Sequence, residues 1–508
     1  MSKWKKLAGV ALAATMVLVT ACGNSNKSES SPSSSSAAPS SSAAQTDAGE
    51  TYEVVMGYPL LGPVPKDQAE VEAAISKITK EKINATVKLL AIPFAQWSQQ
   101  ANLMLTGNEK LDLMLTDFAT YGSMVSTKRF AALDDLIAQN GKGIQEALGD
   151  KLNAAKIDGK IYAVPVNQLP EGGSALFLRK DLLDQAGVDV STVKSVDDLD
   201  NVFKALKEKN PQMTVLAPNV QGAMPLTTIF DSLGQYDSLL DGLGVLNVND
   251  AGMKVVDLYE TPEYAAAMKK LRSWYQAGYL PKGASTIKIS NTDQVKSGKA
   301  ISFVDSDKPA SEKKEAAIVG FDVAKVPMQK PLLTTQGVLG LDWAIPANNS
   351  RNPAKAMEFL NLMYTDKDII NLINFGIEGK HYTKKSDNVI SITGDGYGMH
   401  QTFMFGNVHL TYLTDTEDPK SREDGKAFEQ TIVNSKAVGF APNLDAVKTE
   451  VAAVKNVTAQ YVPALETGSV DPDKVLPQLI SKLKAAGIDK IIAEKQKQLD
   501  AWLASNGK

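Results

Sequence analysis

Cysteine is almost absent from this sequence, because Cys22 is the only one in 508 residues. A single thiol near the N-terminus excludes an internal disulfide, and it leaves no cysteine elsewhere for a metal site or a catalytic nucleophile. Histidine is nearly as scarce, with three residues, and no His-Glu-x-x-His pattern brings two of them together. We therefore expect no metal and no other cofactor, and we assign His400 and His409 to surface or packing roles.

A strong excess of charge is also missing, since the formal net charge of the chain is −4. A nucleic-acid-binding protein would show a basic stripe or patch, and none stands out, so we expect no nucleic-acid partner. The Gly-x-Ser-x-Gly pattern of serine hydrolases is absent as well. A glycoside hydrolase is not excluded in this way, because it needs only two well-placed carboxylates and the chain has 58 acidic residues.

Long apolar runs are confined to the N-terminus. Three lysines precede an apolar run at 7–19, which is shorter than the roughly 20 residues of a membrane-spanning helix. The run leads into Val-Thr-Ala-Cys at 19–22, so we expect a cleavable signal peptide at 1–21. This segment resembles the lipobox of bacterial lipoproteins, which implies that Cys22 carries lipid and holds the protein at the outer face of the cell membrane. An ordinary secretory signal with an incidental cysteine is the alternative.

Residues 22–50 consist mainly of Ser, Ala and Pro and show no apolar periodicity. Such a segment cannot bury enough apolar surface to offset the loss of chain entropy, so we predict a disordered tether. A flexible chain of this length spans roughly 30 Å. The folded part would therefore stay within reach of a membrane partner.

From residue 51 onward, β-prone runs alternate with helical patterns. Strands are predicted at 52–57, 84–90 and 111–116, with helical patterns between them. This alternation is typical of βαβ units around a mainly parallel sheet, so we predict an α/β fold. Ligands of open α/β sheets bind beyond the carboxyl ends of the strands. The segments that follow the three strands contain Tyr58, Trp97, Asp117 and Tyr121.

The second half of the chain is predicted to be richer in helices. Helical patterns cover 353–364 and 366–375. A later helix is predicted to begin at Asp471, an N-cap acceptor followed by proline, and to end at Gly487. Because one core rarely organises more than about 250–300 residues, we expect more than one lobe.

Eight short segments occur in the order in which similar segments occur in one protein family. They are GKIYAVP at 159–165, LRKDLLDQAG at 178–187, SVDDL at 195–199, VKSGKA at 295–300, LDWAIP at 341–346, NFGIEGKHY at 374–382, GID at 487–489 and EKQKQ at 494–498. On these segments and the lipobox, the chain resembles the extracellular solute-binding proteins of family 1, the maltose-binding-protein-like lipoproteins of ABC importers. Within that family it is similar to a Gram-positive subfamily with an extended C-terminal domain.

The resemblance implies a two-lobed periplasmic-binding-protein-like fold of type II with three hinge crossings. It places lobe one at 51–164 and 320–347, and lobe two, with a C-terminal helical extension, at 165–319 and 348–508. A ligand that contacts both lobes binds the closed form better and shifts the population toward it. The resemblance further implies a monomer that delivers its ligand to the permease subunits of an ABC importer and is not an enzyme.

A carbohydrate, in particular an oligosaccharide, is the ligand class that we expect. A sugar presents an apolar CH face and a rim of hydroxyls, so its site needs flat aromatic rings beside carboxylate and amide groups. Besides the four residues after the strands, the candidates are Gln168, Asp342, Trp343, Glu378, His381 and Tyr382. A peptide ligand is the main alternative, for which Arg179 is the only arginine well placed to meet a carboxylate. A surface glycoside hydrolase is a further alternative.

Several candidates have a structural alternative. Trp97 lies on a predicted helix, so a position in the core explains it as well as a contact with the ligand does. Trp343 lies in an apolar strand, but its place beside Asp342 at a predicted crossing favours the cleft. Segment 391–413 is rich in glycine and aromatic residues, and we expect an ordered loop on lobe two, with a cleft wall as the alternative.

Overall fold

The computed structural model describes residues 49–168, 172–220, 224–398 and 401–506. Residues 51–508 form a compact unit that contains every helix and strand named below. The predicted signal peptide, Cys22, nearly all of the predicted tether and His400 lie outside the described residues. Within the described ranges, no helix is both long enough and apolar enough to cross a membrane.

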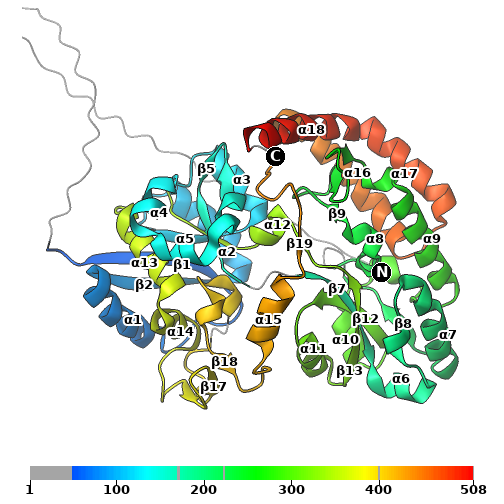
Figure 1. Ribbon diagram of the computed structural model, residues 1–508, viewed down its shortest axis with the longest axis horizontal. Helices are drawn as coiled ribbons and strands as arrows, with labels where there is room; N and C mark the ends of the chain where they lie inside the picture. The colour runs from blue at the N-terminus through cyan, green and yellow to red at the C-terminus, as the bar shows by residue number, and fades with distance from the viewer. Residues whose placement is uncertain (1–48, 169–171, 221–223, 399–400, 507–508) are drawn as a thin grey trace, which may run out of the picture. The chain divides into compact units, whose positions relative to one another are not determined.

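The first lobe is built on a five-stranded sheet with the order β2-β1-β3-β15-β6. Strand β1 runs parallel to β2 and β3, whereas β15 is antiparallel to both of its neighbours. Helices α1 and α2 connect the first three strands, which is the predicted βαβ arrangement (Figure 1). The bounds of these elements are β1 Tyr52–Leu60, α1 Gln68–Ile83, β2 Ala85–Pro93, α2 Phe94–Thr106, β3 Leu113–Thr116, β6 Ala163–Pro165 and β15 Asp342–Ala344.

The sequence of α1 explains where this helix packs and ends. Val71, Ile75 and Thr79 are buried at a spacing of four residues, which places them on one face of the helix. Asn84 takes the left-handed conformation with φ 48°, and its N–H closes the last turn on the carbonyls of Thr79 and Lys80. Strand β2 therefore begins at the next residue.

The second lobe has its own four-stranded sheet with the order β13-β7-β12-β8. Strand β12 is parallel to β8, and β7 is antiparallel to both β12 and β13. The rings of Phe203 on α7 and Trp274 on α9 meet edge to face, with centroids 5.0 Å apart, in a core separate from that of the first lobe. The bounds are β7 Gly172–Arg179, α7 Leu199–Lys209, β8 Thr214–Ala217, α9 Pro262–Gln276, β12 Ala300–Asp307 and β13 Val323–Gln329.

The chain passes between the two sheets three times, as the resemblance implied. The first crossing joins β6 to β7, the second joins β13 to β15, and the third leads from α15 (Ser421–Glu429) to α16 (Lys448–Glu466). The second and third crossings lie side by side, because β14 (Leu332–Leu333) pairs with β19 (Val433–Asn434). Gly173, with φ 52°, sits so close to the second crossing that an added Cβ would lie 2.0 Å from the carbonyl oxygen of Gln329.

Two segments lie in a different lobe from the one we expected. Strand β13 falls in the stretch 320–347 assigned to lobe one, yet it pairs with β7 of the second sheet. Helices α13 (Pro353–Thr365) and α14 (Lys367–Phe375) fall in the stretch assigned to lobe two, yet their apolar faces pack into the core of the first lobe. The sequence shows that these helices are amphipathic, but their apolar stripes do not specify which sheet they cover.

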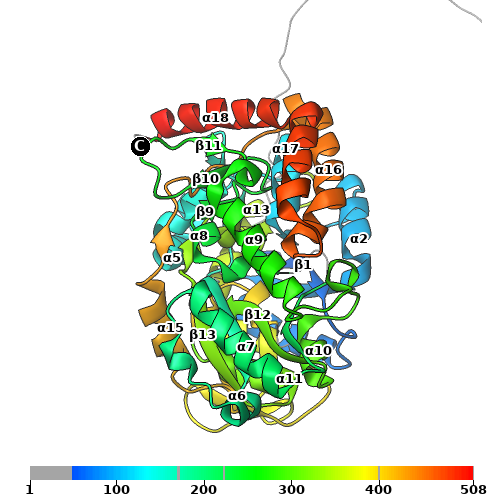
Figure 2. The ribbon, with the colours of Figure 1, turned by 90° about the vertical axis from the view of Figure 1, so that its right-hand side faces the viewer.

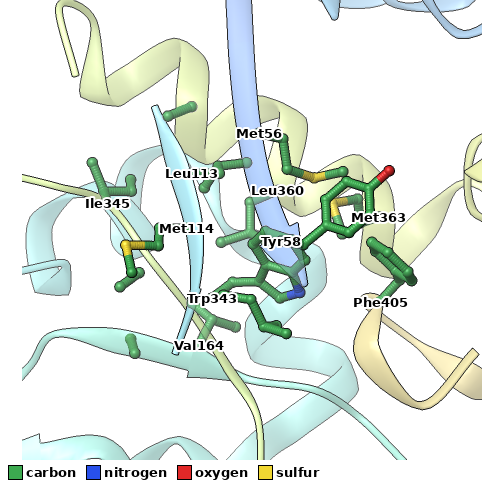
Figure 3. Close-up of a cluster of buried hydrophobic side chains, with 14 of the residues drawn as sticks. Met56, Tyr58, Leu113, Met114, Val164, Trp343, Ile345, Leu360, Met363 and Phe405 are labelled. Atoms are coloured by element: carbon green, nitrogen blue, oxygen red, sulfur yellow. The ribbon is translucent and has the colours of Figure 1, made fainter. Parts of the chain in front are cut away.

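Segment 391–413 also packs on the first lobe rather than the second. Met404 and Phe405 belong to the first core, together with Tyr397. Figure 3 shows Phe405 beside Tyr58 of β1 and near Met363 of α13. Tyr397 and Phe405 of this segment therefore fill the first lobe's core, whereas Phe403 is 40% exposed and Tyr412 belongs to a separate small cluster.

The C-terminal region forms three helices on the second lobe, α16, α17 (Pro472–Ala486) and α18 (Ile488–Ser505). Figure 2 shows them beside α9 and across a small sheet of β9 (Tyr236–Asp237), β10 (Val245–Asn247) and β11 (Val255–Val256). Asp471 caps α17 by accepting the N–H of Asp473 at 3.1 Å, and Gly487 ends it with φ 98°, so both predicted ends are confirmed. Lys495 of α18 is fully buried and pairs with Asp241. Its Nζ also donates to the carbonyl of Gly244 at 3.1 Å, which fastens α18 to the lobe.

Candidate functional site

The carboxyl ends of β1 and β2 carry exposed apolar side chains on the first lobe. Leu60 and Pro93 are paired neighbours at the ends of these parallel strands. The next residues, Leu61 and Phe94, are 59% and 62% exposed. Trp97, one turn further along α2, is half-buried against the core. Large apolar side chains exposed together at a strand edge are typical of a ligand surface.

Asp117 follows β3 at the same edge and caps helix α3 (Phe118–Ser126). Its Oδ1 accepts the N–H of Thr120 at 3.0 Å and the hydroxyl of the same residue at 2.9 Å. Oδ1 of Asp117 thus caps the helix. Because the residue is half-exposed, a hydrogen-bond donor of a ligand can still approach the carboxylate.

The second lobe contains a pocket of about 420 Å³ at the carboxyl end of β8. The segments 218–220 and 224–226, which follow β8, form one side. Helix α16, η6 (Ala284–Thr286) and Ile287 also contribute to the lining. Apolar side chains make up most of the lining, and the polar groups are Asn219, Ser285, Lys455, Thr458, Glu466 and Thr467. This volume and lining suit one or two sugar rings.

Glu466 is the acid of this pocket, and its surroundings favour a proton on it. Burial raises the pKa of the Glu466 carboxyl to about 7, and the hydroxyl of Tyr264, which donates to its Oε1 at 3.2 Å, offsets only part of that effect. Glu466 is also the last residue of α16, where the negative end of the helix dipole disfavours a carboxylate. Tyr259 lines the pocket as well, and its ring packs edge to face on Tyr264.

Tyr58 and Tyr121 do not reach a ligand surface in this structure, contrary to our expectation. Strand β1 continues to Leu60 rather than ending at Gly57, so Tyr58 lies inside the strand and is fully buried. Tyr121 is 2% exposed, and its hydroxyl donates to the carbonyl of Ala155. Both rings belong to the first core.

Asp342 and Trp343 are fully buried as well, which corrects their assignment to the cleft. The indole Nε1 of Trp343 donates to the carbonyl of Met404 at 2.9 Å, and the ring packs against Phe405 (Figure 3). Asp342 lies between Thr116 and Pro165 on the neighbouring strands. Neither of its carboxylate oxygens has a hydrogen-bond partner in the described part of the chain, and burial raises the pKa of its carboxyl well above the usual range.

The other three candidates of the later half form local contacts of the first lobe. His381 is buried, accepts the N–H of Ile377 on Nδ1 at 2.8 Å, and meets Asp67 through Nε2 at 3.1 Å. Tyr382 is 5% exposed in a small cluster with Phe375 and Tyr412. Glu378 is exposed and pairs with Lys384 at 2.8 Å.

Gln168 lies in the first crossing, next to Asn167, and its side chain is half-buried. It approaches Gly340 of the second crossing, because an added Cβ at Gly340 would lie 3.9 Å from its Nε2. Gln168, Asp117 and Trp97 are thus the predicted residues that keep accessible surface at strand ends and crossings. The remaining predicted residues were not brought together there.

The described residues offer no group of three or more His, Cys, Asp or Glu side chains that could hold a metal ion. In the first lobe, the strand ends present an apolar surface with one carboxylate. In the second lobe, the end of β8 presents an apolar pocket with one carboxyl group. Such a combination can bind a polyhydroxylated ligand through ring stacking and hydrogen bonds.

None of the residues predicted from the sequence to bind a ligand lines the pocket of the second lobe. The strand-end residues that we predicted to bind a ligand follow only the first three strands. The apolar run 214–217 followed by Pro218 and Asn219 carries the same signal. The contribution of α16 had no sequence signal, because it depends on how a distant helix packs.

Comparison with known proteins gives two family matches. Residues 73–375 match the family described as bacterial extracellular solute-binding protein. Residues 436–504, which include all of α16 and α17 and nearly all of α18, match a domain family of unknown function. A carbohydrate ABC transporter substrate-binding protein of Streptococcus pneumoniae serotype 4 (strain ATCC BAA-334 / TIGR4) is 28% identical over 513 residues, covering 99% of each chain.

Solved structures agree with these matches. The crystal structure of the N-glycan transport solute binding protein NgtS from Streptococcus pneumoniae has a TM-score of 0.78 and 27% identity to this chain, covering 90% of it and 100% of NgtS. A structure of NgtS in complex with Man1GlcNAc has a TM-score of 0.68 at 27% identity, covering 89% of this chain and 99% of that one.

Proposed function

Because the chain belongs to the bacterial extracellular solute-binding proteins, we propose that it captures an oligosaccharide outside the cell and delivers it to the permease of an ABC importer. The similar proteins are binding proteins, so this chain binds a substrate and is not an enzyme. The surface glycoside hydrolase that the sequence left open is thereby set aside. The lobes would close on the ligand, and a permease that recognises the closed form would respond to occupancy.

The observation that carries the proposal is the match along 99% of the chain to a carbohydrate transport protein. The chemistry of the site is consistent with a carbohydrate ligand. Leu61 and Phe94 give the first lobe an exposed apolar surface, and the pocket of the second lobe combines apolar walls with Asn219 and Glu466. These groups can stack on the CH faces of a sugar and form hydrogen bonds with its hydroxyls.

N-glycan-type oligosaccharides are the first ligands to test. NgtS is described as an N-glycan transport protein and was crystallised with Man1GlcNAc and Man5GlcNAc. We propose that this chain takes a related oligosaccharide of mannose and N-acetylglucosamine. Peptides remain the competing ligand class.

We expect Phe94→Ala to weaken the binding of Man5GlcNAc about thirtyfold. If the ring of Phe94 stacks on a sugar, about 80 Å² of apolar area leaves water, which contributes roughly 2 kcal/mol. Isothermal titration calorimetry on the protein without residues 1–50 measures the affinity. The matched control is Leu103→Ala, because Leu103 is also exposed, at 56%, but lies near the other end of α2.

Small-angle scattering of the same samples adds a test of closure, since the bound protein should have a smaller radius of gyration. Binding of peptides and not of glycans by the wild type would contradict the proposed ligand class. Equal affinity of Phe94→Ala and wild type would remove the edge of α2 from the site.

We also propose that Cys22 anchors the mature protein by lipid at the outer face of the cell membrane. Two or more acyl chains hold a protein stably, because each buried CH₂ contributes about 0.8 kcal/mol. Cys22→Ala should leave an uncleaved precursor or release the protein into the medium. Mass spectrometry of the wild-type N-terminus checks the assignment, and a mature protein that begins at another residue or carries no lipid would contradict it.

A further inference from the structure

The pocket of the second lobe contains the carboxyl group of Glu466. This group accepts one hydrogen bond from the protein and can accept another from a ligand. The hydroxyl of Tyr264 donates to Oε1 of Glu466, and within the described residues no second donor to this carboxyl occurs. Glu466 lines the pocket, and its oxygens are not among the buried side-chain atoms that lack a partner. Its second oxygen is therefore open to the pocket, where a ligand group can reach it.

The charged groups around Glu466 do not neutralise it. From α9, Tyr264 donates to it, whereas Arg272 is engaged with the carbonyls of Gly468 and Ser469 just beyond α16. Tyr259 approaches from η5 (Leu258–Glu260), and the buried Asp257 approaches from the residue before η5. Lys455 lines the pocket three turns away on α16 itself.

These surroundings make the ionised form costly until a ligand supplies a donor. With the pKa of its carboxyl at about 7, Glu466 is about half protonated at pH 7 in the free protein. A hydroxyl that donates to the open oxygen stabilises the carboxylate, so it lowers the pKa and drives the proton into solution. A ligand group that accepts a hydrogen bond would instead hold the proton in place.

We infer that Glu466 is a specificity-determining residue of the pocket, that it selects a ligand hydroxyl, and that ligand binding releases a proton from it. This inference rests on the proposed function, since the hydroxyl belongs to the bound sugar. Beyond that function, Glu466 is the group of the second lobe that recognises the sugar. It also makes capture stronger above pH 7 than below it.

Calorimetric titration of Man1GlcNAc at pH 7, in two buffers with different ionisation enthalpies, measures the protons released. We expect about half a proton per ligand, and an affinity that rises about tenfold between pH 6 and pH 8. In Glu466→Gln the release and the pH dependence should disappear, and the affinity at pH 8 should fall about tenfold. Tyr264 can still donate to the amide oxygen, so this variant should fold, which circular dichroism checks.

The matched control is Glu450→Gln on the same helix, because Glu450 pairs with Lys490 at 3.0 Å and lies outside the pocket. On ligand binding, the Glu450→Gln variant should release as many protons as the wild type does. Unchanged proton release in Glu466→Gln would overturn the assignment while leaving sugar binding intact. Failure of the wild type to bind either Man1GlcNAc or Man5GlcNAc would overturn the proposed function, and with it the role of Glu466.

Discussion

Trp343→Ala should lower the free energy of unfolding by about 3–5 kcal/mol, and the folded fraction should bind its ligand with unchanged affinity. The ring is fully buried in the first core. It packs against Phe405 with centroids 5.9 Å apart and holds the carbonyl of Met404 through its indole N–H. Alanine would leave a large cavity and an unpaired carbonyl, and both lower stability.

Urea denaturation followed by far-UV circular dichroism measures the loss, with calorimetry for ligand affinity. Trp343→Phe is the matched control, because it keeps most of the ring and removes the hydrogen bond. We expect it to cost less than the alanine variant. A thirtyfold loss of affinity at unchanged stability would contradict the core position and place the ring in the ligand site.

Asp342→Asn should abolish a pH dependence of stability that is specific to this buried carboxyl. In the folded protein, burial raises its pKa well above the ordinary value of 3.8. The unfolded chain therefore ionises first as the pH rises, and it binds fewer protons than the folded chain. Stability is fully present below the unfolded pKa, declines by about 1.4 kcal/mol per pH unit above it, and levels off at the raised folded pKa.

Asparagine has no proton to lose, so the variant should lack this slope while carrying a constant cost for its buried amide. Urea denaturation at half-unit steps from pH 4.5 to 8 provides the curves. Glu466 and Asp257 also have raised pKa values, near 7 and 6, so the difference between wild type and variant isolates Asp342. Asp395→Asn, at an exposed acid, should reproduce the wild-type curve, whereas parallel curves for wild type and Asp342→Asn would refute the prediction.

Both variants concern neighbouring residues whose position the sequence did not determine. Strand β15 is buried on both faces, so its three residues show no alternation of apolar and polar side chains. An acid in such a strand looks like a site residue, because buried carboxyls without partners are rare. Only the packing of β3 and β6 on either side shows that Asp342 has no contact with solvent.

The local pattern of the sequence determined the α/β class, the alternation of the first strands and helices, and the caps of α17, because these depend on spacing and on a few residues with strong conformational preferences. Together with the order of its short motifs, it also indicated the family. It did not determine which sheet α13 and α14 cover, because an apolar stripe fits any complementary face. The pocket with Glu466 was decided by tertiary structure alone, since its walls come from segments more than 200 residues apart that meet only when the second lobe is folded.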